Sequence, residues 1–321
     1  MKKMLFIALG LNLAAGAAQA QTKATLHLDW LVNGYHAPFF VAAERGFYKD
    51  AGLDITIRPG KGSVDSARTV ADGAAQFGFP DAATAVKGIS EGMALTMVAV
   101  FLQETPMGIM AFGDKNIRKP KDLEGRTLGN VPIASTAKVM PAFFKRTGVD
   151  PAKVKLVSHT FATAVPSVLA GQVDSGSGYV FGEYLAVKGE AKGREVVWIG
   201  FADHGIQMYS NGIAVNNAFM AANPKAVESF VKASVRGLEW TIQNPDGAIA
   251  ILAKRTETAP AVLKEQLMVA LPLMNNAEAK KNGLGSMTAD KWKITQDIMV
   301  EYGEQKARVP DDKAWTTRFL K

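Results

Sequence analysis

Apolar and polar residues alternate near the start of the chain in a pattern that predicts a strand, a helix and a second strand. Leu26 and Leu28 alternate with polar neighbours over 25–31, as in a half-buried strand. Pro38 then opens an apolar helix, and a second strand is predicted over 53–58. Ligands of open α/β sheets bind beyond the carboxyl ends of strands, so the loop after the first strand is a candidate ligand site.

Short strands and helices continue to alternate along the chain. Apolar runs bounded by turn residues predict strands over 76–79, 95–102, 107–112, 126–130, 154–158, 173–175, 194–200 and 211–216. Helical spacing and helix-start residues predict helices over 63–73, 80–91, 135–147, 163–170 and 178–189. The last third is mostly helical, with helices predicted over 224–243, 246–254, 261–270 and 288–303.

This order of elements predicts an α/β fold with two lobes, because the strand and helix units form two blocks and no period of 20 to 50 residues repeats. We expect two hinge crossings between the lobes, near 105–112 and 210–216, because both stretches are extended and carry glycine. The first lobe would then comprise 21–108 and 215–321, and the second lobe 109–214.

The first 20 residues have the pattern of a signal peptide. Lys2 and Lys3 precede a short apolar run, and the small residues Ala18 and Ala20 mark a cleavage site before Gln21. The chain contains 0 cysteines, which excludes disulfides, thiolate metal ligands and a lipid anchor on cysteine. These features predict a protein exported to the periplasm in soluble form.

Composition and charge narrow the function classes. The formal net charge is +7, but Lys and Arg are spread along the chain and aromatic residues do not interleave with them. We therefore predict no nucleic-acid partner and assign the excess charge to a solvated surface. The hydrophobic content of 48% is that of an ordinary globular protein.

Several catalytic and cofactor motifs are missing. The chain has no G-x-S-x-G, Walker or H-E-x-x-H motif, and the glycine-rich run 171–182 lacks the context of a dinucleotide site. A metal pair of His27 and His36 is conceivable, but strand alternation would put His27, with Asp29, on the face opposite Leu28, which disfavours a metal site. We predict no catalytic residue, no cofactor and no metal.

The remaining candidates for a ligand site are aromatic, amide and hydroxyl side chains near predicted strand ends and helix starts. Flat side chains at strand ends can sandwich a planar ring, although core packing explains each aromatic residue equally well. The helix starts at Ser63, a candidate N-cap, and at Ser135 and Thr136 could hold an anion. Phe39, Phe40, Phe143 and Phe144 lie on helical faces, where we expect core packing. The full candidate set is Asp29, Trp30, Asn33, Tyr35, His36, Ser63, Phe79, Ser135, Thr136, Tyr179 and Glu183.

Glu183 has two interpretations. It stands at the start of a predicted helix, where an acid is favoured by the helix dipole. A carboxylate there can equally accept hydrogen bonds from an amino group on a ring. The residues alone leave both roles open.

The motifs together resemble the NMT1/THI5-like family. LDWLVNGYHAPFFVAAERGFYKDAGLDI, residues 28–55, is similar to the family's opening, in which a strand ends in Asp-Trp and is followed by Asn, His and an aliphatic helix. The likeness continues through 78–85, 106–112, 117–129 and 171–183. The resemblance implies a two-lobed periplasmic solute-binding protein of type II architecture, the capture component of an ABC importer.

In the pyrimidine-binding members, aromatic residues near the Asp-Trp loop stack on the ring and an acid binds its amino group. Trp30 and Glu183 match those positions. The stretch 32–35 departs from the Pro-Asn-Thr-Asn form of those members. A branch of pyrimidine-synthesis enzymes has a cysteine-rich active-site pattern that this chain cannot supply.

The favoured hypothesis is therefore a monomeric binding protein that captures a small heteroaromatic solute of the thiamin-pyrimidine type. It would deliver this solute to the permease and ATPase subunits of the importer. The alternatives are a binder of a sulfonate, an aromatic carboxylate or riboflavin, and an enzyme of pyrimidine synthesis that uses His36 as a base.

Overall fold

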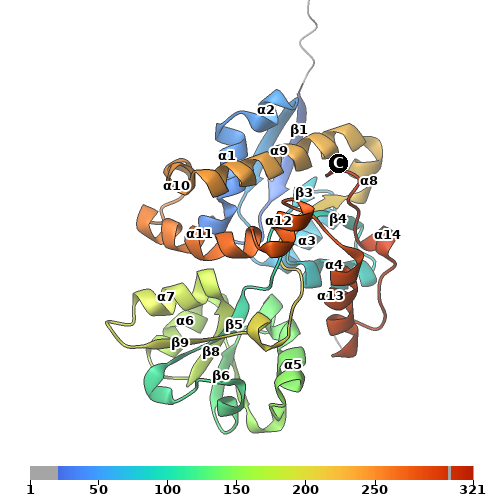
Figure 1. Ribbon diagram of the computed structural model, residues 1–321. Coiled ribbons are helices and arrows are strands. Elements are labelled where there is room, and N and C mark those ends of the chain that lie inside the picture. Colours follow the sequence, from blue (N-terminus) through green and yellow to red (C-terminus); the bar gives the residue numbers. More distant parts are fainter. Residues whose placement is uncertain (1–20, 303–304, 321) are drawn as a thin grey trace, which may run out of the picture.

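The computed structural model describes residues 21–302 and 305–320. The predicted signal peptide lies outside these residues. Two five-stranded sheets form two lobes, one above the other in Figure 1. The predicted two-lobed α/β fold is confirmed.

Each sheet has the same strand order. The first sheet runs β2 (Leu53–Arg58), β1 (Thr22–His27), β3 (Phe77–Gly78), β10 (Gly212–Asn216) and β4 (Leu95–Val100). The second runs β7 (Lys155–Ser158), β6 (Thr127–Asn130), β8 (Ser175–Tyr179), β5 (Met107–Phe112) and β9 (Val196–Gly200). The fourth strand of each sheet, β10 or β5, is antiparallel to both of its neighbours.

The chain crosses between the sheets slightly earlier than predicted. It leaves the first sheet after β4 and returns after β9, so the crossings are 101–106 and 201–211. The predicted hinge stretches 105–112 and 210–216 are mostly strands β5 and β10. Both strands are buried and pair on both sides, so their backbone groups are satisfied within a sheet. The predicted boundary at 214 accordingly falls inside a strand of the first lobe.

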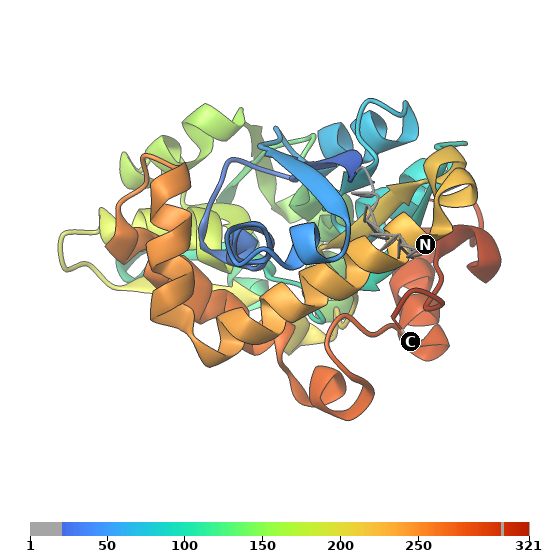
Figure 2. The ribbon, with the colours of Figure 1, turned by 90° about the horizontal axis from the view of Figure 1, so that it is seen from above.

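Most helices belong to the first lobe. They are α1 (Ala37–Glu44), α2 (Phe47–Asp50), α3 (Ser63–Ala71), α4 (Ala82–Ser90), α8 (Asn217–Ala222), α9 (Pro224–Gln243), α10 (Pro245–Leu252), α11 (Pro260–Met274), α12 (Ala277–Asn282), α13 (Ala289–Glu301) and α14 (Asp311–Ala314). The second lobe holds α5 (Ser135–Thr147), α6 (Phe161–Leu169) and α7 (Leu185–Gly189). Figure 2 shows α9, α10 and α11 as an arc around α1.

In the amphipathic helix α9, the apolar positions of the sequence form part of the hydrophobic core. Pro224 opens the helix, and its apolar stripe is buried. Phe230 on this stripe stacks on Phe77 of β3, with ring centroids 3.7 Å apart, and on Tyr48 at 5.3 Å. Within the described residues, no helix combines the length and apolar character needed to cross a membrane.

The expected core residues of the helical faces are buried. Phe39 and Phe40 of α1 pack into the core of the first lobe, and Phe143 and Phe144 of α5 into that of the second. The predicted strand 25–31 is wrong at its end, because β1 stops at His27 and the chain turns at residue 28 into the loop that precedes the 3₁₀-helix Gly34–His36. The predicted helix 178–189 is also wrong at its start, because β8 extends to Tyr179.

Helix α13 contacts both lobes. Trp292 packs in a cluster with the first lobe, whereas Ile298 and Met299 pack in the same cluster as Phe143 of α5. In Figure 1, α13 descends beside the second lobe. The C-terminal segment, predicted as part of the first lobe, therefore lies across the boundary between the two lobes.

Candidate functional site

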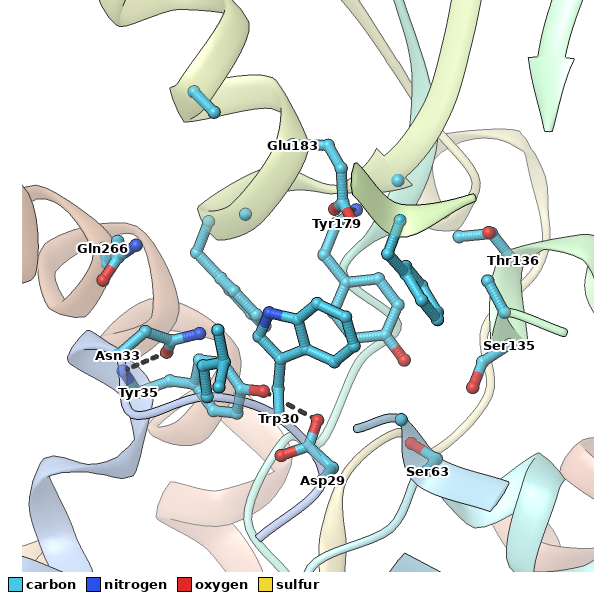
Figure 3. Close-up of a pocket in the computed structure, with 18 of the residues that line it drawn as sticks. Asp29, Trp30, Asn33, Tyr35, Ser63, Ser135, Thr136, Tyr179, Glu183 and Gln266 are labelled. Carbon is cyan, nitrogen blue, oxygen red and sulfur yellow. Dashed lines mark hydrogen bonds between the residues drawn. The ribbon is translucent and has the colours of Figure 1, made fainter. Parts of the chain in front are cut away.

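A cavity of about 350 Å³ lies between the lobes. Its walls come from the loop after β1, the starts of α3 and α5, the end of β8, and α11. Figure 3 shows the side chains that point into it. Nine of the predicted ligand-binding residues line the cavity: Asp29, Trp30, Asn33, Tyr35, Ser63, Ser135, Thr136, Tyr179 and Glu183.

The loop after β1 is held through its backbone carbonyl groups by the loop after β2. Gly62 N–H donates to the Asp29 carbonyl at 2.7 Å, and Gly60 N–H donates to the Trp30 carbonyl at 3.1 Å. A Cβ on Gly60 would lie 2.0 Å from the Leu28 carbonyl oxygen, so this close approach requires glycine. These contacts fix the direction in which Asp29 and Trp30 enter the cavity.

Asp29 is the buried acceptor of a small hydrogen-bond network. Tyr35 Oη donates to Asp29 Oδ2 at 2.7 Å, and His36 Nε2 lies 2.8 Å from Oδ1. Asn33 N–H donates to His36 Nδ1 at 3.2 Å, so Nδ1 carries no proton, Nε2 is the donor, and the imidazole is neutral. Burial, together with the Asp29 charge, raises the pKa of Tyr35 well above its ordinary value. Asp29 therefore brings a carboxyl group that is held by two hydrogen bonds to the cavity wall.

His36 and Phe79 do not line the cavity, contrary to the prediction that they contact a ligand. The His36 side chain is fully buried behind Asp29, and both of its ring nitrogens have protein partners. Phe79 is fully buried and packs edge-on against Phe39 and Phe101, with ring centroids 4.8 Å and 5.8 Å apart. Both support the wall from within the core.

Glu183 enters the cavity from the second lobe. It lies in a short π-helix, Val180–Tyr184, directly after β8. Tyr179 N–H donates to Glu183 Oε2 at 2.8 Å. Burial raises the pKa of Glu183 above its ordinary value, and the Tyr179 N–H opposes this rise. The carboxyl thus satisfies a backbone group at the helix start and also faces the cavity, so the two interpretations of this residue do not exclude each other.

The rings of Trp30 and Phe161 meet across the cavity. Their centroids lie 4.5 Å apart at an interplanar angle of 58°, and they belong to different lobes. Leu31 and Ile133 flank the opening and are 61% and 66% exposed. Sequence reasoning did not select Phe161, because the predicted helix began at residue 163 and left Phe161 outside any predicted element, whereas α6 begins at this residue.

Ser63 and Ser135, at the two helix starts, have hydrogen-bond partners in the protein. Ser63 is the first residue of α3 and its side chain does not cap the helix, so the predicted N-cap is wrong. Its Oγ accepts the Asp81 N–H at 3.1 Å. Ser135 Oγ lies 3.0 Å from Thr84 Oγ1, a hydrogen bond between α5 of the second lobe and α4 of the first.

Asp81, behind these helix starts, is fully buried. Ala83 N–H, Thr84 N–H and Ser210 Oγ donate to its carboxyl. Desolvation outweighs these hydrogen bonds and raises the pKa of Asp81 to about 6. Burial and the charges of Asp81 and Asp29 also raise the pKa of Tyr179 well above its ordinary value. The carboxyl groups of Asp29 and Asp81 thus both lie close enough to Tyr179 to affect its pKa.

The cavity has acidic but no basic side chains. Among the described residues that line it, Asp29 and Glu183 are acidic and none is Lys, Arg or His. The described part of the chain also holds no group of three or more His, Cys, Asp or Glu side chains arranged to bind a metal ion. The arrangement can accept hydrogen bonds from a ligand and cover its faces with apolar rings.

Gln266 of α11 and Thr258, just before α11, also line the cavity, and sequence reasoning missed both. Gly34 N–H donates to Gln266 Oε1 at 2.9 Å, across a sequence separation of 232 residues. No local motif marks either residue, because 261–270 was predicted only as one more helix and Thr258 lies just before it.

Comparison with known proteins identifies relatives over most of the chain. The sequence profile of a family described as NMT1/THI5 like matches residues 33–248. The chain is 27% identical to the riboflavin-binding protein RibY of Chloroflexus aurantiacus over 318 residues, covering 96% of this chain and 89% of that protein. It is 25% identical to the formylaminopyrimidine-binding protein of Halalkalibacterium halodurans over 296 residues, covering 90% and 88%.

Two further proteins are similar to the chain, one in sequence and one in fold. A 4-amino-5-hydroxymethyl-2-methylpyrimidine phosphate synthase of Legionella pneumophila is 24% identical over 237 residues, covering 73% of this chain and 74% of that protein. The structure of the alkanesulfonate-binding protein SsuA from Xanthomonas axonopodis pv. citri bound to MOPS matches with a TM-score of 0.71 at 14% identity, covering 92% and 98%. This likeness confirms the predicted periplasmic-binding-protein fold.

Proposed function

The chain belongs to the NMT1/THI5-like family, and from this premise we propose that it is the periplasmic solute-binding component of an ABC importer. Its ligand is a small heteroaromatic molecule with amino groups, of the thiamin-pyrimidine type. The ligand binds in the cavity between the lobes. The relatives named as riboflavin-binding and formylaminopyrimidine-binding proteins support a role in solute binding.

The choice of ligand is supported by one observation: the cavity combines an acidic side chain from each lobe with several aromatic rings. Asp29 enters from the first lobe and Glu183 from the second, and Trp30, Phe161 and Tyr179 line the space around them. Amino groups on a planar ring can donate to the carboxylates while the ring packs against the aromatic side chains. Contacts from both lobes to one ligand also favour the closed arrangement of the lobes.

The same charges disfavour an anionic ligand such as a sulfonate or a carboxylate. The starts of α3 and α5 do supply backbone N–H groups of the kind that bind anions. However, no Lys or Arg among the described residues lines the cavity, and Asp29 and Glu183 would repel a negative charge. The likeness to a sulfonate-binding protein therefore extends, in this proposal, to the fold and not to the ligand.

A role as a pyrimidine-synthesis enzyme is also disfavoured. His36, the base proposed for that role, is buried and neutral, and Asp29 and Asn33 N–H occupy its two ring nitrogens. The chain has 0 cysteines, so it lacks the cysteine-rich pattern of that branch. We therefore propose a binding protein without catalytic activity.

The proposal includes the location and partners of the protein. The N-terminal 20 residues act as a cleavable signal peptide, and the mature protein is a periplasmic monomer. It delivers its ligand to the permease and ATPase subunits of the importer.

A ligand screen on the purified mature protein tests this function. Thermal shift and native mass spectrometry would compare aminopyrimidines, riboflavin, alkylsulfonates and aromatic acids. At a ligand concentration of one hundred times Kd, we expect stabilisation of about 2.7 kcal/mol by an aminopyrimidine. Stabilisation by an alkylsulfonate alone, or by riboflavin alone, would contradict the assigned ligand class while leaving solute binding intact. Chemical conversion of a bound pyrimidine would contradict the absence of catalysis.

A further inference from the structure

A buried hydrogen bond joins the two lobes directly. Thr84 Oγ1 of α4 and Ser135 Oγ of α5 lie 3.0 Å apart, and the two residues are only 5% and 9% exposed. Ala83, one residue earlier in α4, belongs to the apolar cluster of the second lobe. The start of α4 therefore meets the second lobe through a hydroxyl group and a methyl group, both shielded from water.

Asp81 fixes the first turn of α4 from behind. Its buried carboxyl accepts the Thr84 N–H at 3.2 Å, so it caps the helix and sets the position of Thr84. The same carboxyl accepts Ser210 Oγ–H at 2.9 Å, from the crossing 201–211. Asp81 N–H donates to Ser63 Oγ, which lines the cavity, at 3.1 Å. Asp81 thus connects the second crossing between the lobes to the cavity wall and to Thr84.

Ser135 connects Thr84 to the cavity. It is the first residue of α5, and it lines the cavity together with Thr136. Figure 3 shows Ser63, of the first lobe, and Ser135, of the second, on the same side of the cavity. Thr84 does not itself line the cavity, so any effect on the site passes through Ser135 and through the contact between the lobes.

An ion pair between α7 and α11 also joins the lobes, but it lies at the surface. Lys188 Nζ and Glu265 Oε1 are 3.4 Å apart, and their side chains are 53% and 49% exposed. Water and salt screen such pairs, so this one contributes little to closure. The hydroxyl pair is buried, and opening the lobes about the two crossings would break it.

We propose that Thr84 is a positioning residue of the site, whose hydrogen bond to Ser135 holds the lobes closed with or without a ligand. The effect on binding rests on the proposed function. The apparent Kd of a ligand that binds between closed lobes is the intrinsic Kd divided by the closed fraction. Loss of this hydrogen bond therefore weakens the binding of every such ligand by the same factor, whereas loss of a ligand contact affects different ligands unequally.

The variant Thr84→Val keeps the shape of the side chain and removes its hydroxyl group, whereas Thr84→Ser keeps the hydroxyl group and should behave as wild type. The chain has 0 cysteines, so nitroxide labels can be attached at Glu190→Cys and Met268→Cys alone, two exposed residues on different lobes. Pulsed electron–electron double resonance then measures the lobe separation in the free protein. We expect a closed population in wild type, and a closed-to-open ratio about 3- to 10-fold lower in Thr84→Val.

Calorimetric titration completes the experiment with two probes, 4-amino-2-methylpyrimidine and its 5-hydroxymethyl derivative. In Thr84→Val, both Kd values should rise by one common factor, equal to the factor by which the closed fraction falls. Thr241→Val is the matched control. It removes a buried hydroxyl group that donates to the Gly237 carbonyl within α9, and it should change neither Kd nor the lobe separation.

A free wild-type protein without a closed population, or equal lobe distances in wild type and Thr84→Val, would overturn the inference. A loss of affinity for one probe alone would also overturn it, because Thr84 would then act on a ligand contact. Wild-type protein that binds neither probe would contradict the proposed ligand class. The lobe distances of the free protein would still decide the inference in that case.

Discussion

Replacing Glu183 by glutamine separates its contact with the ligand from its contact within the protein. The carboxyl faces the cavity and accepts the Tyr179 N–H at 2.8 Å. Glutamine keeps this contact through its own oxygen and has nearly the same shape, but its other terminal atom is an NH₂ donor. Glu183→Gln therefore removes one acceptor from the cavity without removing the support of the π-helix.

The expected loss of affinity follows from the kind of hydrogen bond that is removed. A hydrogen bond from a ligand amino group to a carboxylate contributes about 1.5–3 kcal/mol. Since 1.4 kcal/mol corresponds to a factor of ten, Kd should rise roughly 10- to 150-fold. The new NH₂ group also faces the donor of the ligand, which places the expected value toward the upper end of this range.

The free protein should respond in the opposite direction. Because burial raises the pKa of Glu183, the folded protein binds more protons than the unfolded chain between the ordinary and the raised pKa. This carboxyl therefore makes stability fall as pH rises through that window, and above it the charged form destabilises the fold. Glu183→Gln should melt at the same or a higher temperature than wild type at pH 7.5, and this difference should shrink at pH 4.

Calorimetric titration and thermal melting of both proteins at several pH values provide the measurement. Glu190→Gln, a change of the same kind at an exposed residue outside the cavity, is the matched control and should alter neither quantity. An unchanged Kd combined with a lower melting temperature in Glu183→Gln would refute the reasoning. That result would reduce Glu183 to a structural role at the helix start.

Three further substitutions test the aromatic wall and the buried acid behind it. Trp30→Ala should weaken ligand binding by about 1–3 kcal/mol with little effect on the free protein, because the indole is only partly buried. Phe79→Ala, at a fully buried side chain, should instead lower the free energy of unfolding by about 3–5 kcal/mol. If melting and titration data show instead that Trp30→Ala lowers stability and Phe79→Ala lowers affinity, the two roles are exchanged. Asp81, with a pKa raised to about 6 from 3.8, makes stability fall by about 2 kcal/mol as pH rises from 4 to 6. Asp81→Asn should flatten this part of the pH–stability curve from chemical denaturation, and an unchanged slope would contradict the assignment.

Local pattern was sufficient to predict most elements. Alternation, apolar runs and helix-start residues located β2, β5, α5 and α9 with the bounds that the structure shows. Element ends were less well predicted. The last residue pair between β1 and β2 joins His27 to Arg58, and β1 ends there. The order of apolar and polar residues along β1 contains no information on where β2 ends.

The sequence also led to nine of the residues that line the cavity, because each stands at a strand end or a helix start and those positions meet at one edge of each sheet. It could not distinguish a side chain that faces the cavity from one that supports it. Trp30 and Phe79 both follow strands, yet the packing of Phe79 against Phe39 and Phe101 turns it into the core.

The sequence by itself determined the secondary-structure order, the two-block organisation and the absence of cysteine chemistry, because these depend on neighbouring residues and on composition. Only the tertiary structure brought the two acidic side chains of the cavity together. Asp29 and Glu183 come from different lobes and line one cavity only because the lobes meet. The tertiary structure also decided the orientation of Gln266, which depends on a hydrogen bond to Gly34 across 232 positions. Contacts at such separation leave no local periodicity, so the polar specificity of the site becomes visible only in the folded chain.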